Sequence, residues 1–201
     1  MNTTLLKIHG FYAQTFQEET MTQLSLDKDN NVSSVVNNAK AFNFDSVKKH
    51  VYKMQCKAAR KQGKQCPPML KSVDALYMNN MACFVEFKHG YRLHGPSNDR
   101  YQENMIGSAK DSLVMHYQFL SGQSVNHSSY DSIFVAVIQA GSDALAVAQA
   151  HRASTSTRQL ESALLAELKK QLSAYTYNGL YYSKVEVWNA VNFGSRLITN
   201  T

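Results

Sequence analysis

Glu86 and Lys88 are charged residues near the end of an otherwise apolar run, 81–88 (MACFVEFK). Buried charges are costly unless they are paired or bind a metal ion. Because successive side chains of a strand point to opposite faces, Glu86 and Lys88 share one face, while Val85 and Phe87 share the other. By themselves the two charged residues would form a structural ion pair. A second carboxylate beside them would instead create a site for a cation.

Asp74 decides between these two interpretations. It lies in the preceding strand-like run, and Asn79-Asn80 between the two runs predicts a hairpin. A two-residue loop would place Asp74 opposite Val85, on the wrong face of the sheet. A three-residue loop or one bulge would bring it opposite Glu86. We therefore expect such an irregularity, or a bend of the strand at Asp74.

Two carboxylates and an amine that meet at one point are the groups that phosphodiester hydrolysis requires. Oxygen ligands suit a hard divalent cation such as Mg²⁺ or Mn²⁺, and Mg²⁺ typically keeps several of its water molecules. Such an ion activates water and stabilises negative charge on a phosphate. Lys88 would lie within reach of the same water or phosphate, as a point charge or a proton carrier. The residue types therefore predict a metal-dependent hydrolase.

The elements that must position these residues follow from apolar periodicity and turn residues. A helix is predicted over Phe44–Gln62, with Asp45 or Asn43 as its cap, and Gly63–Pro68 ends it. The other predicted elements are short strands at 20–26 and 32–36, strands at 69–78 and 81–88, a loop at 89–99, a helix at 104–120, a buried strand at 132–138, a short helix or ordered loop at 144–153, a helix at 157–175, a strand at 181–189 and a short C-terminal helix. This order indicates an α/β fold in which helices flank a mixed β-sheet.

The Asp…Glu-x-Lys pattern on a hairpin, between one helix and a helix followed by a buried strand, resembles the PD-(D/E)xK nuclease superfamily. The resemblance covers roughly residues 44–139. It implies a restriction-endonuclease-like core, with Asp74 and Glu86 as metal ligands and Lys88 as the catalytic lysine. It also implies Mg²⁺ or Mn²⁺ as cofactor, DNA as substrate, and a role in phage defence or mobile-element biology. Val73 stands where members usually have proline, and the Gln-x-x-x-Tyr signature of the RecB-type branch is not evident.

The segments FVEFKHG, IGSAKDSLVMHYQFL and LYYSKVEVW are also similar to a group of uncharacterised bacterial proteins, whose FIEFKNG-like strand is followed by a K-x-DSL-type helix. We expect a single domain over 1–201. Within it, residues 1–43 form an N-terminal extension, 44–140 a nuclease-like core, and 141–201 a helix and strand that complete the core.

The positive charge of the chain is concentrated in one segment. The formal net charge is +6 and the sequence pI is about 9.2, and the segment 48–71 holds eight cations and no carboxylate. An anionic partner, DNA rather than RNA, would use the candidate contacts Lys49, Lys53, Lys57, Arg60, Lys64 and Lys110. The alternative for the first five is the solvated face of an amphipathic helix, and Lys110 would then be a surface lysine.

The three cysteines, Cys56, Cys66 and Cys83, are best explained as reduced thiols in the cytoplasm, because their number is odd. A zinc site formed by Cys56, Cys66 and His50 would fit no common finger spacing. No apolar run is long enough to span a membrane, and no secretory signal is recognised. A homodimer or a partner subunit is compatible with the sequence.

Several side chains have two interpretations. Asp45 is a helix cap or an additional metal ligand, and the loop residues His89 and His94 touch substrate or are solvated. The C-terminal aromatic residues stack on bases or pack in the core: Tyr175, Tyr177, Tyr181, Tyr182 and Trp188. The whole chain also has two alternatives to an active nuclease. One is a catalytically silent nuclease-fold subunit that binds a protein or nucleic-acid partner in a defence or toxin-type assembly, and the other is an unrelated fold with a Glu86–Lys88 ion pair.

Overall fold

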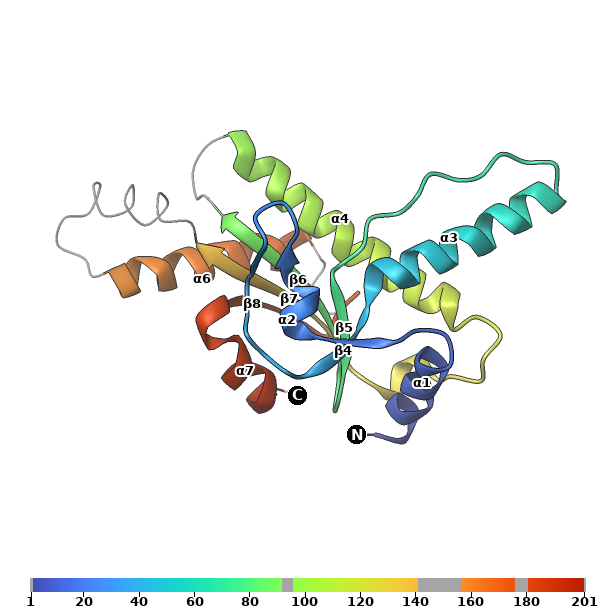
Figure 1. The fold of residues 1–201 in the computed structure, drawn as a ribbon, viewed down its shortest axis with the longest axis horizontal. Coiled ribbons are helices and arrows are strands. Elements are labelled where there is room, and N and C mark those ends of the chain that lie inside the picture. Colours follow the sequence, from blue (N-terminus) through green and yellow to red (C-terminus); the bar gives the residue numbers. More distant parts are fainter. Residues whose placement is uncertain (1, 92–95, 141–156, 176–180, 201) are drawn as a thin grey trace.

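A six-stranded mixed sheet organises the chain (Figure 1). The computed structural model describes residues 2–91, 96–140, 157–175 and 181–200. In spatial order the strands are β1 (Glu18–Thr20), β4 (Lys40–Asn43), β5 (Ala75–Met78), β6 (Ala82–Tyr91), β7 (Ser132–Ala140) and β8 (Lys184–Asn189). Neighbours from β1 to β6 are antiparallel, whereas β6, β7 and β8 are parallel. The α/β class and the mixed sheet flanked by helices are thus confirmed.

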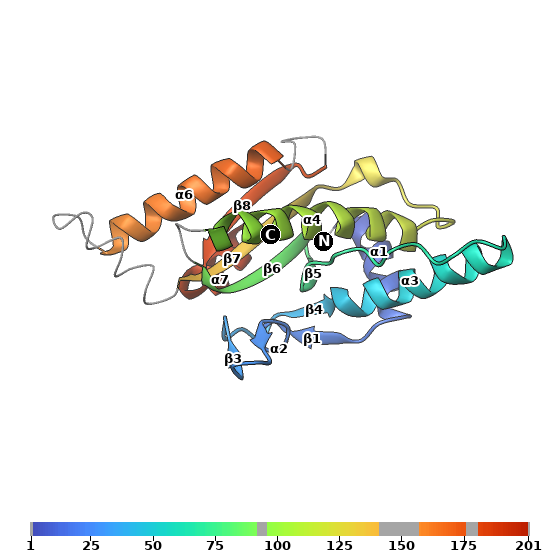
Figure 2. The ribbon, with the colours of Figure 1, turned by 90° about the horizontal axis from the view of Figure 1, so that it is seen from above.

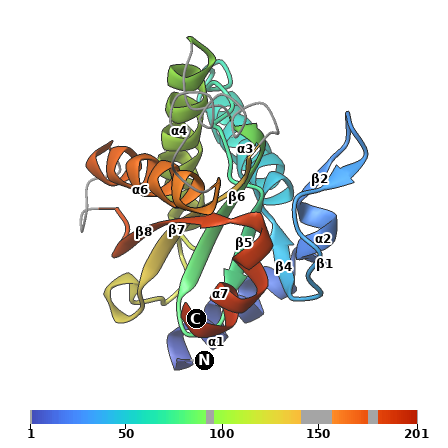
Figure 3. The ribbon, with the colours of Figure 1, turned by 90° about the vertical axis from the view of Figure 1, so that its left-hand side faces the viewer.

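Helices cover both faces of the sheet. One core cluster joins a sheet face to α1 (Thr3–Ala13), α3 (Phe44–Lys61), α4 (Pro96–Phe119) and α6 (Thr157–Tyr175). A second cluster joins the opposite face to α2 (Met21–Leu24) and α7 (Phe193–Asn200). Figure 2 shows α4 lying across the sheet, and Figure 3 shows α7 away from α4. Within the described ranges, no helix is long and apolar enough to cross a membrane.

The inner strands β6 and β7 lie inside the sheet because most of their residues are apolar. The run Ile133–Ile138 is buried throughout, because it is covered from both faces. Parallel pairing with β7 continues along β6 from Ala82 to Tyr91, with a register shift between His89 and Tyr91. The strand is therefore longer than predicted, and α4 begins as early as Pro96. The predicted loop over 89–99 was wrong at both ends: pairing with β7 extends β6 to Tyr91, and α4 already begins at Pro96.

The N-terminal residues contain elements that periodicity did not predict. They include α1 and the strands β1 and β4 of the main sheet. The strands expected at 20–26 and 32–36 are found in part, as a separate hairpin of β2 (Leu26–Asp27) and β3 (Val32–Ser33). The predicted strand at 20–26 is mostly the helix α2, which starts with a capping box between Thr20 and Gln23. Two single-turn 3₁₀ helices, His127–Ser129 and Ala190–Asn192, complete the described elements. The predicted element at 144–153 lies outside the described residues.

The first strand of the predicted hairpin is shorter than expected. It begins at Ala75, and the preceding residues hydrogen-bond to α4. The backbone N–H of Lys71 donates to Asp111 at 2.9 Å, and that of Val73 donates to the hydroxyl of Ser112 at 2.9 Å. Side chains of α4 thus satisfy amides that a longer strand would have paired with a neighbouring strand.

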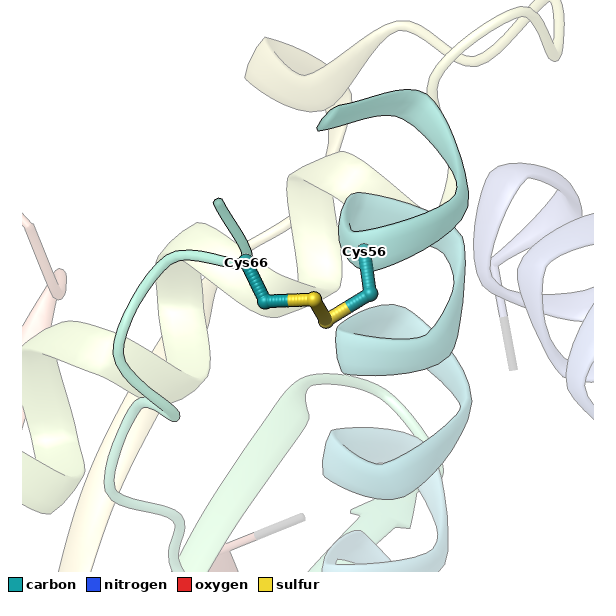
Figure 4. Close-up of a disulfide and its surroundings, with 2 residues drawn as sticks. All are labelled: Cys56 and Cys66. Carbon is teal, nitrogen blue, oxygen red and sulfur yellow. A yellow bond between two sulfur atoms is a disulfide. The ribbon is translucent and has the colours of Figure 1, made fainter. Parts of the chain in front are cut away.

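Two of the three cysteines are bonded to each other, contrary to the expectation of reduced thiols. Cys56, near the end of α3, forms a disulfide with Cys66 in the following loop (Figure 4). Their Cα atoms are 4.6 Å apart because the chain turns back after the helix. Cys83 is free and buried. The zinc interpretation is also wrong, since the two sulfurs are bonded and the ring of His50 packs against Phe16 and Phe119.

A buried histidine ties α1 to α4. Nδ1 of His116 lies 2.8 Å from the hydroxyl of Tyr12, and its Nε2 lies 2.8 Å from the hydroxyl of Tyr130. The side chain of His116 is fully buried. Burial, and to a smaller extent the nearby His127, lowers the pKa of His116 from 6.5 to about 3. The ring is therefore neutral in the folded protein at neutral pH, and it satisfies two hydroxyl groups in the core.

We expect His116 to make the fold sensitive to mild acid. The unfolded chain takes up a proton on this residue below pH 6.5, whereas the folded chain does not until about pH 3. Its contribution to stability is therefore full above pH 6.5 and is lost as the pH falls. From about pH 7 to about pH 5, the free energy of unfolding measured with urea should fall by roughly 2 kcal/mol more in the wild type than in His116→Gln.

The half-exposed His9 on α1 provides a matched control. The variant His9→Gln should keep the acid sensitivity of the wild type. Equal pH dependence in the wild type and in His116→Gln would show that the buried ring is not responsible.

Candidate active site

The hairpin of β5 and β6 has the register that the site requires. Met78 pairs with Ala82, so the connection is a three-residue loop, and the N–H of Asn79 donates to the carbonyl of Met81 at 3.2 Å. This loop was one of the expected irregularities, and the structure confirms it. The paired register ends at Ala75–Val85, and Asp74 lies in a bend just before β5. The two acids, twelve positions apart in the chain, are nevertheless close enough for the charge of Asp74 to raise the pKa of Glu86.

Asp74 is fixed by the backbone of β6. Its N–H donates to the carbonyl of Val85 at 3.0 Å, and its Oδ2 accepts the N–H of Phe87 at 2.6 Å. On this side of β6, the amide of Phe87 is thus satisfied by a side chain rather than by a neighbouring strand. The carboxylate lies beside Glu86 with one oxygen engaged, and its residue is only half-buried.

Glu86 and Lys88 form an ion pair whose inner end is buried. Nζ of Lys88 lies 2.5 Å from Oε1 of Glu86. The side chain of Glu86 is 3% exposed, whereas that of Lys88 is 22% exposed and reaches the surface. The other oxygen of Glu86, Oε2, is buried and has no hydrogen-bond partner among the described residues. An unsatisfied buried carboxylate oxygen is costly, so this atom is where a further positive group would stabilise the site.

The start of α3 places a third acid close to this pair. The side chain of Asn43 caps the helix by accepting the N–H of Ser46, and Asp45 lies in the first turn. Asp45 is therefore not the N-cap. Its Oδ1 accepts the hydroxyl of Ser72 at 2.6 Å and also binds the ammonium group of Lys48. Its side chain is 56% exposed, so it lies at the outer rim of the site.

The segment that carries Asp74 is held to both helices. Ser72 binds Asp45 of α3, while the amides of Lys71 and Val73 bind α4 as described above. The ammonium group of Lys71 donates to Oδ1 of Asn104 at 2.8 Å. Gly107 permits this approach, because a Cβ atom there would lie 2.9 Å from Cδ of Lys71. Sequence reasoning missed this support, although the adjacent Asp111 and Ser112 were visible as polar residues within an apolar helix.

Burial raises the pKa of both acids. For Glu86, burial and then the charge of Asp74 raise the pKa to about 8, although Lys88 opposes this shift. For Asp74, burial raises the pKa to about 6, although the Phe87 amide and Lys88 oppose it. Burial by itself would lower the pKa of Lys88, but the neighbouring Glu86 and Asp74 outweigh it and the pKa is raised. Lys88 therefore stays a cation, and a single cation does not neutralise both carboxylates.

The donor atoms suit a weakly coordinated hard cation better than a closed metal site. In the described part of the chain, no group of three or more histidine, cysteine, aspartate or glutamate residues is arranged to hold a metal ion. Asp74 and Glu86 offer two carboxylates, one with an unpartnered buried oxygen. Mg²⁺ is often bound through one or two carboxylates while it keeps several waters, so this pair fits that ion.

The basic residues predicted to contact nucleic acid do not converge on these acids. Lys49, Lys53, Lys57 and Arg60 are exposed along α3, and Lys64 is exposed just after it. Arg60 lies fifteen residues beyond Asp45, which corresponds to about 22 Å along a helix. Lys110 is half-buried on α4.

The other candidate residues have structural surroundings. Nε2 of His89 lies 2.6 Å from the hydroxyl of Ser34 and 3.2 Å from the carbonyl oxygen of Ser25, so it holds the N-terminal segment against β6. His94 lies outside the described residues. Tyr182 and Trp188 are buried, and the hydroxyl of Tyr182 donates to the carbonyl of Ala109 at 2.6 Å. For these two aromatic residues, core packing is confirmed over base stacking.

A second acid–lysine cluster lies on β8 and serves as an internal comparison. Glu186 is buried and binds Lys169 of α6 at 2.8 Å and Lys184 at 2.7 Å. Burial would raise the pKa of Glu186, but the two lysines outweigh it and the pKa is lowered. Its VEV pattern resembles the VEF of β6, yet both oxygens of Glu186 have cationic partners. Glu86 differs because a second acid, rather than a second lysine, is its neighbour.

We expect the Glu86–Lys88 pair to be strongly coupled. Lys88→Met leaves a buried carboxylate without its cation and should cost about 3 kcal/mol of unfolding free energy. The loss should grow from about pH 6 to about pH 9, because Glu86 escapes it at lower pH by taking up a proton. The double variant Glu86→Gln/Lys88→Met should lie within about 1 kcal/mol of the wild type.

Urea unfolding of Lys88→Met, Glu86→Gln and the double variant measures this coupling. Lys169→Met is the matched control, since Glu186 keeps Lys184 and the removed lysine is 42% exposed. It should cost less than about 1 kcal/mol. Losses that simply add in the double variant would contradict a coupled pair.

Comparisons with known proteins do not extend this picture. The chain matches no family model, no curated protein and no solved structure. The features of this chain that bear on function are therefore the arrangement of Asp74, Glu86 and Lys88 and the order of elements around them.

Proposed function

We propose that this protein is a metal-dependent phosphodiesterase that hydrolyses DNA, with Asp74, Glu86 and Lys88 as its catalytic residues. The observation that carries the proposal is the buried, unpartnered oxygen of Glu86 beside a second carboxylate. A purely structural ion pair requires neither feature. The pair Glu186–Lys169 shows how the same chain satisfies a buried acid when its role is structural.

Asp74 and Glu86 would hold Mg²⁺ or Mn²⁺. When bound, such an ion supplies an activated water and neutralises charge on the phosphate. Lys88 keeps its proton, since its pKa is raised, so it acts as a cation and hydrogen-bond donor to a phosphate oxygen rather than as a base. Its partial exposure allows contact with a substrate outside the protein, while Glu86 holds its amine in place.

The order of elements supports assignment to the PD-(D/E)xK superfamily. Helix α3, the hairpin of β5 and β6, helix α4 and the buried strand β7 follow one another in the expected sequence. The proposal of a restriction-endonuclease-like core depends on this order and on the three residues. Cytoplasmic action in phage defence or mobile-element biology is proposed from the resemblance alone.

A catalytically silent nuclease-fold subunit is the second candidate. It is favoured by the closed ion pair, in which Lys88 already occupies one oxygen of Glu86. It is also favoured by the two-acid composition of the site, to which the described residues add no third ligand arranged for a metal. This candidate predicts that the protein binds its partner without cleaving DNA.

Cleavage assays separate the two candidates. With Mg²⁺ or Mn²⁺, we expect hydrolysis of linear, circular or single-stranded DNA, and a loss of at least about 100-fold in Asp74→Asn, Glu86→Gln and Lys88→Met. The ion should also raise the melting temperature of the wild type, and this shift should vanish in Asp74→Asn/Glu86→Gln.

Glu186→Gln is the control, because it changes a buried acid on β8, beyond β7, whose ion pairs are with lysines only. It should keep both the activity and the metal-dependent shift. DNA binding without cleavage, unchanged by the three site variants, would instead establish the silent subunit.

A further inference from the structure

We infer that the outer end of α3 and the loop that returns from it form a second, non-catalytic site for the phosphate backbone of duplex DNA, kept in shape by the Cys56–Cys66 disulfide. This inference rests on DNA as the proposed substrate. The site is an open hollow of about 560 Å³, here called the basic hollow. Its lining includes four cations and both bonded cysteines: Lys53, Lys57, Arg60, Lys61, Cys56 and Cys66.

The cations of the basic hollow repel one another in the free protein. Lys53, Lys57 and Lys61 follow one another at intervals of four residues, where like charges on a helix repel. None of the four cations has an acidic partner within the described residues. Exposed helices normally mix both signs, so an unrelieved set of cations indicates an anionic ligand. The phosphate backbone of DNA carries closely spaced negative charges that would relieve the repulsion.

Helix α3 connects the basic hollow to the candidate active site. Its first residue, Phe44, donates its N–H to the carbonyl of Asp74 at 3.0 Å, so the helix begins at the site. From there it extends away from the sheet (Figure 1). The helical rise from Asp45 to Arg60 is about 22 Å, and duplex DNA rises about 3.4 Å per base pair. DNA lying along α3 would therefore be anchored roughly six or seven base pairs from Asp74, Glu86 and Lys88.

The disulfide joins the two walls of the basic hollow. Cys56 belongs to the helix and Cys66 to the returning loop, and the bond holds the loop against the helix (Figure 4). Residues 61–65 between them are exposed, so little packing supports this part of the loop. A thiol reductant would convert the bond to two thiols while it becomes a disulfide itself, which releases the outer wall. In reducing compartments such bonds are rare and usually transient or redox-sensing, so binding would respond to redox conditions.

Binding measured without divalent metal tests the inference independently of catalysis. With EDTA present, fluorescence anisotropy should follow a labelled duplex of roughly 20 base pairs over a series of salt concentrations. We expect Lys57→Gln/Arg60→Gln to bind about tenfold more weakly at roughly 0.1 M salt, with a salt slope that is smaller by about 2. The control Lys7→Gln/Lys170→Gln removes two exposed lysines from α1 and α6 and should match the wild type.

The cysteine variants test the role of the disulfide. Dithiothreitol should weaken the wild type several-fold, and Cys66→Ser should bind as weakly as the reduced wild type, with no further response to dithiothreitol. Cys83→Ala removes the buried free cysteine and should respond like the wild type. Circular dichroism establishes that each variant is folded.

Each outcome decides a separate claim. Unchanged affinity in Lys57→Gln/Arg60→Gln overturns the binding site, and full affinity in Cys66→Ser overturns the role of the disulfide. If the cation variant loses binding while the wild type cleaves no DNA, the basic hollow stands and the proposed catalysis fails. If the wild type cleaves DNA and the cation variant binds normally, catalysis stands and this inference fails.

Discussion

The placement of two acids, Glu86 buried and Asp74 half-buried, beside a single lysine is the constraint on which the rest of the site depends. Glu86 is placed in an inner strand of the sheet, β6, whose apolar residues from Ala82 to Phe87 are buried in the core. Lys88 satisfies one of its oxygens, and Asp74 adds a second acid close enough to raise the pKa of Glu86. A fold selected for stability alone would place a cation or an apolar residue there, as the lysines around Glu186 illustrate. The raised pKa of both acids and the buried oxygen without a partner are therefore best explained by a positively charged ligand that would hold both acids ionised.

Hydrogen bonds from neighbouring elements fix the position of Asp74 and of the segment that carries it. Asp74 is fixed through its hydrogen bond to the Phe87 amide, and its neighbours are anchored to α3 and α4 by Ser72 and Val73. Preorganised groups of this kind bind a charged ligand without the cost of reorganisation. In the proposed enzyme, the exposed part of Lys88 would face the substrate. Helix α3 starts at the same place, so its cations extend the electrostatic field of the protein outward from the site.

Much of the architecture followed from local patterns. The stripe of apolar residues gave α3 to within one residue of its end, and the continuous apolar run of β7 indicated a strand covered on both faces. The period of two along β6 placed Glu86 and Lys88 on one face. The requirement that Asp74 join them predicted a three-residue loop, a bulge or a bend, and the structure has the three-residue loop. These features depend on neighbours in the chain, so short-range physics determines them.

Tertiary structure decided the features that depend on distant partners. Pairing with β7 extended β6 to Tyr91. Hydrogen bonds from the preceding residues to α4 left Ala75 as the first residue of β5. The turn after α3 brought Cys56 to Cys66, and the core between Tyr12 and Tyr130 made His116 neutral. The sequence by itself determined which residues lie on which face of each element. Only the folded chain decided which faces meet, because a hydrogen bond, a disulfide or a shifted pKa depends on separation in space rather than along the chain.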